Sequence, residues 1–422
     1  MRELSSEQQI ITKAKFSEIQ TIDELAELLN LVYSFLYPTA KLGRKAKNIS
    51  FDAKTLNYLA FGKEKRYNEF QVPKKKAGEF RTISSPIYTL KTIQRCLNAI
   101  FNCIFIPHKT AHGFVVDKSI KTNAERHVGK NYVYNIDLEG FFPNTNNKRI
   151  KTVLGLSPFN LIDQHDTLFT EKAETNRTGR GYLAFLITNL CCENGVLPQG
   201  APTSPTLTNV VCQRLDRKLY KLSKQNSATY TRYADDITFS SNKAIFTDKF
   251  KAEINKIIVE EGYSQNPAKE RLQNNAVRQE VTGVIVNQKL NVTREYLREL
   301  DLRLKIWSKY GYSDAQSKFE AQYKNEKGFL RNKGIIPPME NVLWGKIQFL
   351  GMVRGQNDVI YLRFCDIYKN KCVTQSENIV VEKTQSLDLL NLENESINEV
   401  LNIWESVGIE EAMKVYYSKL SN

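Results

Sequence analysis

The 422-residue chain lacks several features that mark common classes of protein. It has no apolar run near the roughly 18 residues that a membrane-spanning helix needs. Its polar start, MRELSSEQQ, has no hydrophobic stretch of the kind that signal peptides carry. Its seven cysteines form no CxxC pair and lie near no histidine at metal-site spacing, so neither a disulfide framework nor a structural zinc site is expected. We therefore expect a cytoplasmic protein with reduced thiols and no membrane partner.

Composition and charge are more informative than these absences. A hydrophobic fraction of 41% is enough to build cores, and the length favours more than one structural unit. The net charge is +14, but residues 373–422 hold nine acidic and three basic side chains, so this tail carries −6 and the body +20. Because Lys and Arg release counterions from phosphates, a body this basic favours nucleic acid as the partner, with a merely soluble basic surface as the alternative.

Hydrophobic periodicity predicts a mixture of helices and strands without internal repeats. A capping box, Thr21 to Glu24, precedes a helix that runs until Pro38. Lysines beside Gly78 and Arg81 predict a short hairpin with a basic tip. The further predicted elements are helices over 90–106, 207–222 and 293–307 and strands over 132–138, 229–233 and 237–240.

The two short strands flank a pair of adjacent aspartates, Asp235 and Asp236. Two carboxylates on a tight turn repel each other unless a cation shares their charge. Asp137, at the end of another predicted strand, would complete the oxygen ligand set that Mg²⁺ prefers. Two such ions support in-line phosphoryl transfer. An exposed acidic turn is the alternative for the pair alone.

Five motifs in this order resemble the reverse transcriptase family: RTISSP (81–86), NIDLEGFF (135–142), LPQGAPTSP (197–205), YADD (233–236) and NPAK (266–269). The resemblance covers roughly residues 60–310. It implies an α+β fold of the right-hand polymerase type, with an RRM-like palm sheet and a C-terminal helical extension. The implied divisions are an N-terminal helical extension (1–50), fingers (51–135), palm (136–290, with fingers elements before LPQG), thumb (291–372) and an acidic appendage (373–422).

Two further motifs resemble those of retron reverse transcriptases. They are NAxxH, with Asn123, Ala124 and His127, and VTG, with Val281, Thr282 and Gly283. The resemblance implies a bacterial enzyme that copies part of a cognate structured noncoding RNA into a branched RNA–DNA hybrid, primed from a guanosine 2′-hydroxyl. It also implies an anti-phage role with an effector protein. For Asn123 and His127 we expect an RNA contact or a structural role, because a lone histidine is more often structural than catalytic.

The same resemblance implies a role for each motif residue. The catalytic metal ligands are Asp137, Asp235 and Asp236, with the carbonyl of Leu138, around two Mg²⁺ ions that Mn²⁺ could replace. The residues implied to bind the dNTP are Arg81, Lys75, Phe142, Gln199, Gly200 and Lys269. Those implied to bind primer or template are Tyr233, Gly283, Arg294 and Arg298. An aromatic ring at Phe142 would clash with a ribose 2′-hydroxyl, so DNA is the expected product.

Other functions are consistent with the same residues. A group II intron-like or abortive-infection reverse transcriptase would share the carboxylates but differ in priming. An RNA-binding scaffold or antitoxin that restrains an effector would not need them intact. The acidic tail is expected to dock the effector or to self-associate, and covering basic surface of the same chain is the alternative.

Overall fold

The computed structural model describes residues 4–38, 49–73, 79–162, 179–324 and 334–371. Of these described residues, those up to 294 form one compact unit with the short pieces 323–324, 334–335 and 352–354, and the others form a second unit. Lys75, at the predicted hairpin tip, and the acidic tail both lie outside the described residues. No helix in the described part is long and apolar enough to cross a bilayer.

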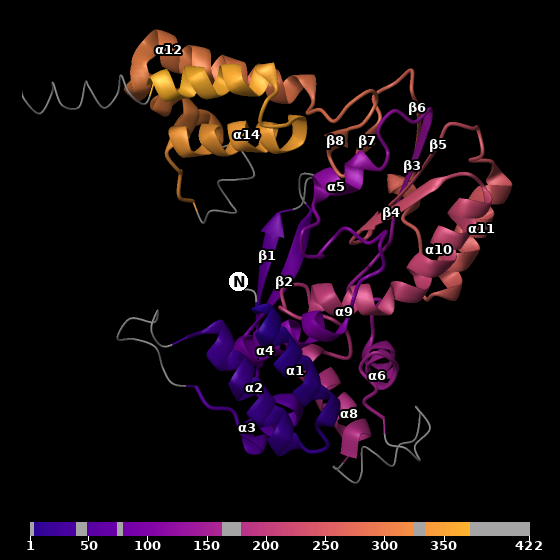
Figure 1. Ribbon diagram of the computed structural model, residues 1–422. Helices are drawn as coiled ribbons and strands as arrows, with labels where there is room; N and C mark the ends of the chain where they lie inside the picture. Colours follow the sequence, from indigo (N-terminus) through magenta and orange to yellow (C-terminus); the bar gives the residue numbers. More distant parts are fainter. Residues whose placement is uncertain (1–3, 39–48, 74–78, 163–178, 325–333, 372–422) are drawn as a thin grey trace, which may run out of the picture. The chain divides into compact units, whose positions relative to one another are not determined.

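Seven of the described helices of the first unit contribute side chains to one hydrophobic core. Figure 1 shows these helices grouped together. The helix predicted from the capping box is α2, and both capping bonds are present: Thr21 Oγ1 accepts from the Glu24 amide, and Glu24 Oε2 accepts from the Thr21 amide. Buried Leu25, Leu29 and Val32 point from it into the core. The helices are α1 (Ser6–Glu18), α2 (Ile22–Leu36), α3 (Ala53–Phe61), α4 (Tyr88–Ile104), α6 (Asn147–Gly155), α8 (Gly179–Cys191) and α9 (Ser204–Val211).

The predicted hairpin is confirmed in its strands, β1 (Tyr67–Pro73) and β2 (Phe80–Pro86), which pair antiparallel, whereas its basic tip lies outside the described residues. Arg66, just before β1, anchors its base. The guanidinium donates to the carbonyls of Leu59, Asn189 and Cys192 and pairs with Glu193 at 2.7 Å. The hairpin is thereby tied to the helical core while its strands extend away from it.

A four-stranded antiparallel sheet adjoins the helices, in the order β4–β5–β3–β6. Its central strand β3 alternates as predicted. Tyr134 and Ile136 enter a core covered by α10 and α11, whereas Asn135 faces the other side and accepts from Thr238 Oγ1 at 3.0 Å. The bounds are β3 (Tyr132–Asp137), β4 (Thr229–Tyr233), β5 (Asp236–Ser241), β6 (Arg271–Asn274), α10 (Gln213–Gln225) and α11 (Asp248–Glu260).

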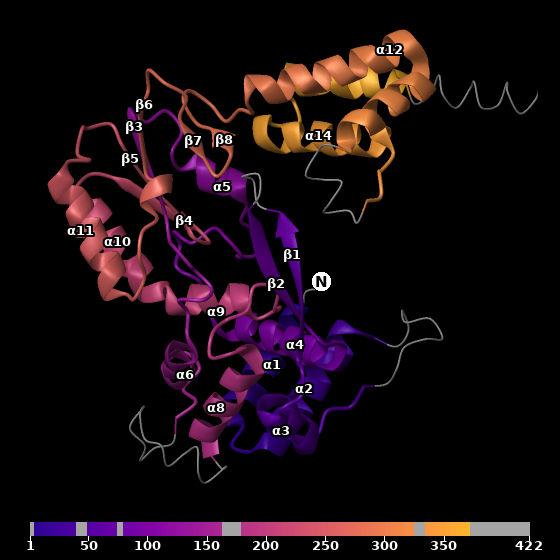
Figure 2. The same ribbon diagram turned by 180° about the vertical axis from the view of Figure 1, so that it is seen from behind.

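The opposite face of the sheet meets α5 (Ile120–Glu125) and the hairpin of β7 (Glu280–Val281) and β8 (Val284–Ile285), as the reverse view shows (Figure 2). The side chain of Asn135 donates to the Glu280 carbonyl at 3.1 Å across this junction. The two motifs that resemble those of retron enzymes therefore lie together against the sheet.

One predicted helix was wrong in its extent. The sequence predicted a single helix over 207–222, but the chain turns at Cys212 (φ −75°, ψ −3°) between α9 and α10. Leu207 packs in the helical core and Leu215 in the core of the sheet. Because the two cores lie in different directions, one straight helix could not bury both residues.

The second unit consists of helices only, within the described residues. Its first helix, α12 (Arg294–Tyr323), is longer than the predicted 293–307, because the chain kinks at Gly311 (φ 80°, ψ 176°) and then continues as a helix. It packs with α14 (Met339–Arg354) and a helical run over 359–371. Trp344 stacks on Tyr368, with ring centroids 5.0 Å apart.

Two glycines of α14 give a matched test of this packing. A Cβ at Gly351 would lie 2.5 Å from the buried ring of Tyr361, whereas one at Gly345 would meet nothing within 4 Å. Gly345→Ala should raise the free energy of unfolding by up to about 1 kcal/mol through helix propensity. Gly351→Ala should lower it by about 1–3 kcal/mol through overpacking. Chemical denaturation measures both, and equal effects at the two positions would contradict the packing.

Candidate active site

Three carboxylates meet where strands of the sheet end. Antiparallel pairing of β3 with β5 sets Asp137 directly opposite Asp236. Asp235 lies in the turn between β4 and β5, and its carbonyl accepts from the Leu138 amide at 3.0 Å. Asp137 is buried, Asp235 is half-buried and Asp236 is exposed. The structure thus brings together all three predicted aspartates, from two separate stretches of the chain.

The carboxylates strongly affect one another. Burial and then the charge of Asp137 raise the pKa of Asp235, while Lys269 and Arg81 oppose the rise. Desolvation of the Asp236 carboxyl group, and then the charges of Asp235 and Asp137, raise the pKa of Asp236 to about 7. The residue as a whole is nevertheless exposed. The cluster therefore carries more negative charge than its surroundings neutralise.

Lys269 supplies part of the missing positive charge. It ends the 3₁₀ turn η2 (Pro267–Lys269), and its Nζ lies 2.8 Å from Asp137 Oδ2. Burial lowers the pKa of Lys269, but the hydrogen bond to Asp137 and the three carboxylate charges outweigh this effect, so the pKa is raised. Lys269 is thus held in its charged form beside the aspartates.

The donor chemistry of the cluster fits Mg²⁺, which prefers oxygen ligands and leaves positions for water and phosphate. Among the described residues, however, no three His, Cys, Asp or Glu side chains already enclose a common point as metal ligands. Asp137 is instead engaged by Lys269. The aspartates form an open set of oxygen donors, which substrate oxygens would have to complete.

Three of the residues implied to bind the dNTP, Arg81, Gln199 and Gly200, lie on or against β2. Arg81 is exposed on this strand, and its charge acts on Asp235. The Gln199 carbonyl accepts from the Ser84 amide at 2.8 Å. Gly200 (φ 125°) approaches so closely that a Cβ would lie 2.7 Å from the Ser84 carbonyl oxygen. Glycine is required at position 200 to pack against β2, a contact that the sequence did not reveal.

Phe142 is half-buried, and Phe141 beside it belongs to the core of the sheet. A residue outside the predicted set, Phe114, contacts Phe142 with ring centroids 6.3 Å apart. Phe114 is exposed and has a left-handed backbone, with φ 61°. The sequence contained AHGF, but nothing in its spacing linked Phe114 to Phe142.

The two motifs resembling those of retron enzymes are largely buried. His127 is fully buried between two hydroxyls, with Nδ1 2.7 Å from Ser240 Oγ and Nε2 2.7 Å from Thr231 Oγ1. Asn123 donates to Thr282 Oγ1 at 3.4 Å and so joins one motif to the other. Asn123, Ala124, His127 and Val281 are buried, which leaves Thr282 and Gly283 as the members that reach the surface.

Several predicted residues are not part of this cluster. Tyr233 pairs with Asp236 across the hairpin and is half-buried. Arg294 and Arg298 are exposed on α12, one turn apart, as their spacing predicted. Lys75 lies outside the described residues. Sequence analysis did not identify Arg232 and Asp216, two fully buried charged residues behind the aspartates. Nothing in their sequence spacing distinguishes them from exposed charged residues.

Comparison with known proteins agrees with this geometry. Residues 72–288, just over half of the chain, match the family described as reverse transcriptase (RNA-dependent DNA polymerase). The chain therefore belongs to the reverse transcriptase family.

Its relatives narrow this assignment. It is 37% identical to the retron Mx65 reverse transcriptase and 35% identical to the retron Mx162 enzyme, both of Myxococcus xanthus, over 55% and 57% of this chain and 53% and 52% of theirs. It is 30% identical to the retron Ec86 reverse transcriptase of Escherichia coli over 62% of this chain and 75% of that one. Among reverse transcriptases, the chain is thus of the retron type.

The matches leave part of each chain uncovered, since the alignments span about half the length of the two Myxococcus relatives. A solved telomerase from Candida albicans, in complex with a fragment of telomeric RNA, is a distant likeness. It shows 10% identity and a TM-score of 0.39 over 76% of this chain and 66% of that one.

The burial of His127 predicts a pH dependence of stability. Burial, then the charges of His112 and Lys130, lowers the pKa of His127 to about 3. The unfolded chain therefore binds a proton below about pH 6.5 that the folded chain does not, so stability is full above that pH and falls below it. The slope from this group is about 1.4 kcal/mol per pH unit.

We expect His127→Gln to remove that slope between pH 6 and pH 4, as measured by denaturant unfolding at each pH. His112, whose pKa burial lowers to about 4, contributes its own slope in both proteins. A wild type and variant with parallel pH profiles would contradict the prediction.

Proposed function

We propose that the chain is an RNA-directed DNA polymerase that copies part of a cognate structured noncoding RNA into single-stranded DNA. The observation that carries the proposal is the pairing of Asp137 with Asp236, beside Asp235, at the end of the sheet. Membership of the reverse transcriptase family supports the same reaction. Reverse transcription needs negatively charged ligands at the point where a primer 3′ end meets a triphosphate.

In this proposal Asp137, Asp235 and Asp236, with the Leu138 carbonyl, hold two Mg²⁺ ions. When bound, the metal ions would stabilise the negative charge on the attacking and leaving oxygens. The raised pKa values of Asp235 and Asp236 support this assignment, because part of each rise comes from the neighbouring carboxylates, whose repulsion a bound cation would relieve. Lys269 would then be displaced from Asp137 and become available to the departing pyrophosphate.

The remaining residues of the site would orient the nucleotide. Arg81 is exposed and acts electrostatically on the cluster, which suits a grip on the triphosphate. Lys75 is assigned to the same role from the motif. Gln199 and Gly200 would present backbone to the template–dNTP pair, and Phe142 would exclude a ribose 2′-hydroxyl. Tyr233 would support the primer end.

The same proposal assigns the hairpin of β1 and β2 to the fingers, the sheet to an RRM-like palm and the helical second unit to the thumb. Arg294 and Arg298 share an exposed helix face, which suits a nucleic-acid backbone. We assign Thr282 and Gly283 to the cognate RNA, with the buried members of NAxxH as their support. The product would be a branched RNA–DNA hybrid primed from a 2′-hydroxyl, with an anti-phage role beside an effector protein.

Removing one carboxylate tests the reaction directly. Asp235→Asn should reduce primer extension with Mg²⁺ by about a thousandfold, equivalent to about 4 kcal/mol of lost transition-state stabilisation. Asp248→Asn, at an exposed carboxylate in the first turn of α11, is the matched control and should keep full activity. Incorporation by Asp235→Asn at the wild-type rate would refute the carboxylate role.

The priming mode has its own test. Cells that express the chain with its neighbouring noncoding RNA should accumulate DNA joined to RNA by a 2′,5′ branch, which a debranching enzyme would release. Asp235→Asn should abolish this product. DNA linked covalently to the protein would instead favour the abortive-infection mode, and unbranched DNA would favour an intron-like one.

A further inference from the structure

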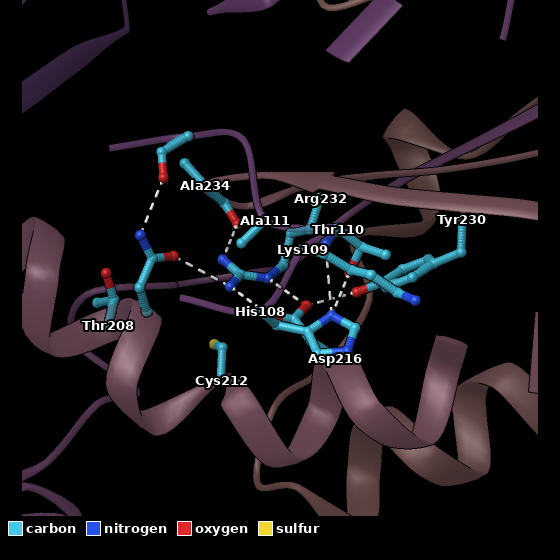
Figure 3. A network of polar contacts seen from close by, with 12 residues as sticks. His108, Lys109, Thr110, Ala111, Thr208, Cys212, Asp216, Tyr230, Arg232 and Ala234 are labelled. Atoms are coloured by element: carbon cyan, nitrogen blue, oxygen red, sulfur yellow. Dashed lines mark hydrogen bonds and ion pairs between the residues drawn. The ribbon is translucent and has the colours of Figure 1, made fainter. Parts of the chain in front are cut away.

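A buried ion pair lies behind the turn that carries the paired aspartates (Figure 3). Arg232 comes from β4 and Asp216 from α10, and neither side chain has any exposed surface. Arg232 Nε lies 2.8 Å from Asp216 Oδ1, and Nη2 lies 2.7 Å from Oδ2. This two-pronged contact fixes the plane of the guanidinium, which a single hydrogen bond would not do.

The remaining donors of the guanidinium reach other segments. Nη1 donates to the carbonyl of Ala234 at 3.0 Å, and Nη2 donates to Asn209 Oδ1 at 3.0 Å. The Asn209 side chain donates in turn to the Gly113 carbonyl at 2.9 Å. Tyr230 donates its hydroxyl to Asp216 Oδ1 at 2.7 Å. The segments that carry Gly113, Asn209, Asp216 and Arg232 itself are therefore joined in one network.

Ala234 is the residue that makes the turn possible. It precedes Asp235 and has a left-handed backbone, with φ 57°. For a residue with a Cβ this conformation is unfavourable and persists only where the surroundings impose it. The Arg232 guanidinium holds the carbonyl of Ala234, and Gly113 packs so tightly that a Cβ there would lie 2.3 Å from the Ala234 amide nitrogen.

The backbone of Arg232 is fixed independently of its side chain. Its amide donates to the Thr110 carbonyl at 2.9 Å, and its carbonyl accepts from the His112 amide at 2.8 Å. The segment that carries Gly113 thereby runs alongside β4. These backbone hydrogen bonds hold Arg232 in place, so its guanidinium is held in position beside Ala234.

A fully buried ion pair is a poor way to gain stability, because desolvation offsets most of the attraction, and apolar side chains of similar volume often serve as well or better. A charge network that ends on one strained carbonyl is better explained by a positioning role. We propose that Arg232 is a positioning residue that fixes the Ala234 turn through its carbonyl and thereby sets the affinity of Asp235 and Asp236 for divalent metal. Asp216 and Asn209 orient it, and the inference rests on the proposed function.

The test separates positioning from stability. In the double variant Arg232→Met/Asp216→Leu, apolar side chains replace both charges, so the loss of an unpaired buried charge is avoided. In Arg232→Lys the positive charge beside Asp216 remains. A single ammonium group, however, cannot reproduce the hydrogen bonds that the planar guanidinium donates to Asp216 and to the Ala234 carbonyl at the same time. Arg66→Met is the matched control, since it breaks the ion pair of Arg66 with Glu193 and four carbonyl contacts in the helical core.

Two measurements need no catalysis: Mn²⁺ binding by electron paramagnetic resonance, and amide hydrogen exchange over residues 229–241. We expect both Arg232 variants to bind Mn²⁺ about tenfold more weakly than wild type, the usual effect of losing a group that orients metal ligands. They should also exchange the amides of Ala234 and Asp235 faster. Arg66→Met should lose stability but keep wild-type Mn²⁺ binding and protection of the turn.

Wild-type Mn²⁺ affinity and turn protection in a folded Arg232 variant would overturn the positioning role. If the double variant fails to fold, Arg232→Lys decides the question. Primer extension by the wild type reports separately on the proposed function. If the wild type neither extends a primer nor binds Mn²⁺, the proposed function fails, and the exchange comparison still decides whether Arg232 holds the turn.

Discussion

The structure depends above all on the antiparallel pairing of β3 with β5, which sets Asp137 opposite Asp236. The register of this pairing allows no slip, because a shift by one residue would exchange the two faces of the sheet. Tyr134 and Ile136 would then leave the core under α10 and α11. The hydrophobic face of β3 therefore fixes the position of a carboxylate at its end, and packing and chemistry are determined by the same strand.

The arrangement of the three carboxylates opposes folding. Burial, and then the charges of the neighbouring carboxylates, raise the pKa of Asp235 and Asp236, so the folded state carries unfavourable desolvation and repulsion. Lys269 reduces that repulsion, since its Nζ lies 2.8 Å from Asp137 Oδ2. The positive charge of Arg81, on the hairpin, lowers the pKa of Asp235. Both of these cationic side chains are exposed, so neither is held in place by surrounding protein. In the proposed function, this mobility would let metal and substrate reach the carboxylates.

Local features of the fold could be predicted from sequence, whereas contacts between distant segments could not. The capping box of α2, the hairpin of β1 and β2 and the alternation of β3 follow from interactions within a few residues. The break at Cys212 depends on two cores that the chain builds separately. The bonds of His127 to Ser240 and Thr231 span more than a hundred residues. No periodicity reports such partners.

The candidate site shows the same division. The three aspartates could be found because a motif names them and their charges call for a cation. The reason for Gly200 could not be found, since its close neighbour is the Ser84 carbonyl on another strand. Arg232 was passed over for a related reason: a basic residue in a strand looks exposed until its partner, Asp216, is seen buried on α10. The sequence therefore does not predict the contacts with distant segments that hold the site residues in place.

Two arginines inside the fold make the nature of this support clearer. Arg66 and Arg232 each form an ion pair with a carboxylate. Each also donates hydrogen bonds to backbone carbonyls. An arginine suits this task because its planar fork serves several acceptors at fixed angles. The carbonyls that Arg66 serves lie among the helices of the core, so its effect is on packing. The carbonyl that Arg232 serves precedes Asp235 directly, so the same chemistry acts there on the geometry of the site.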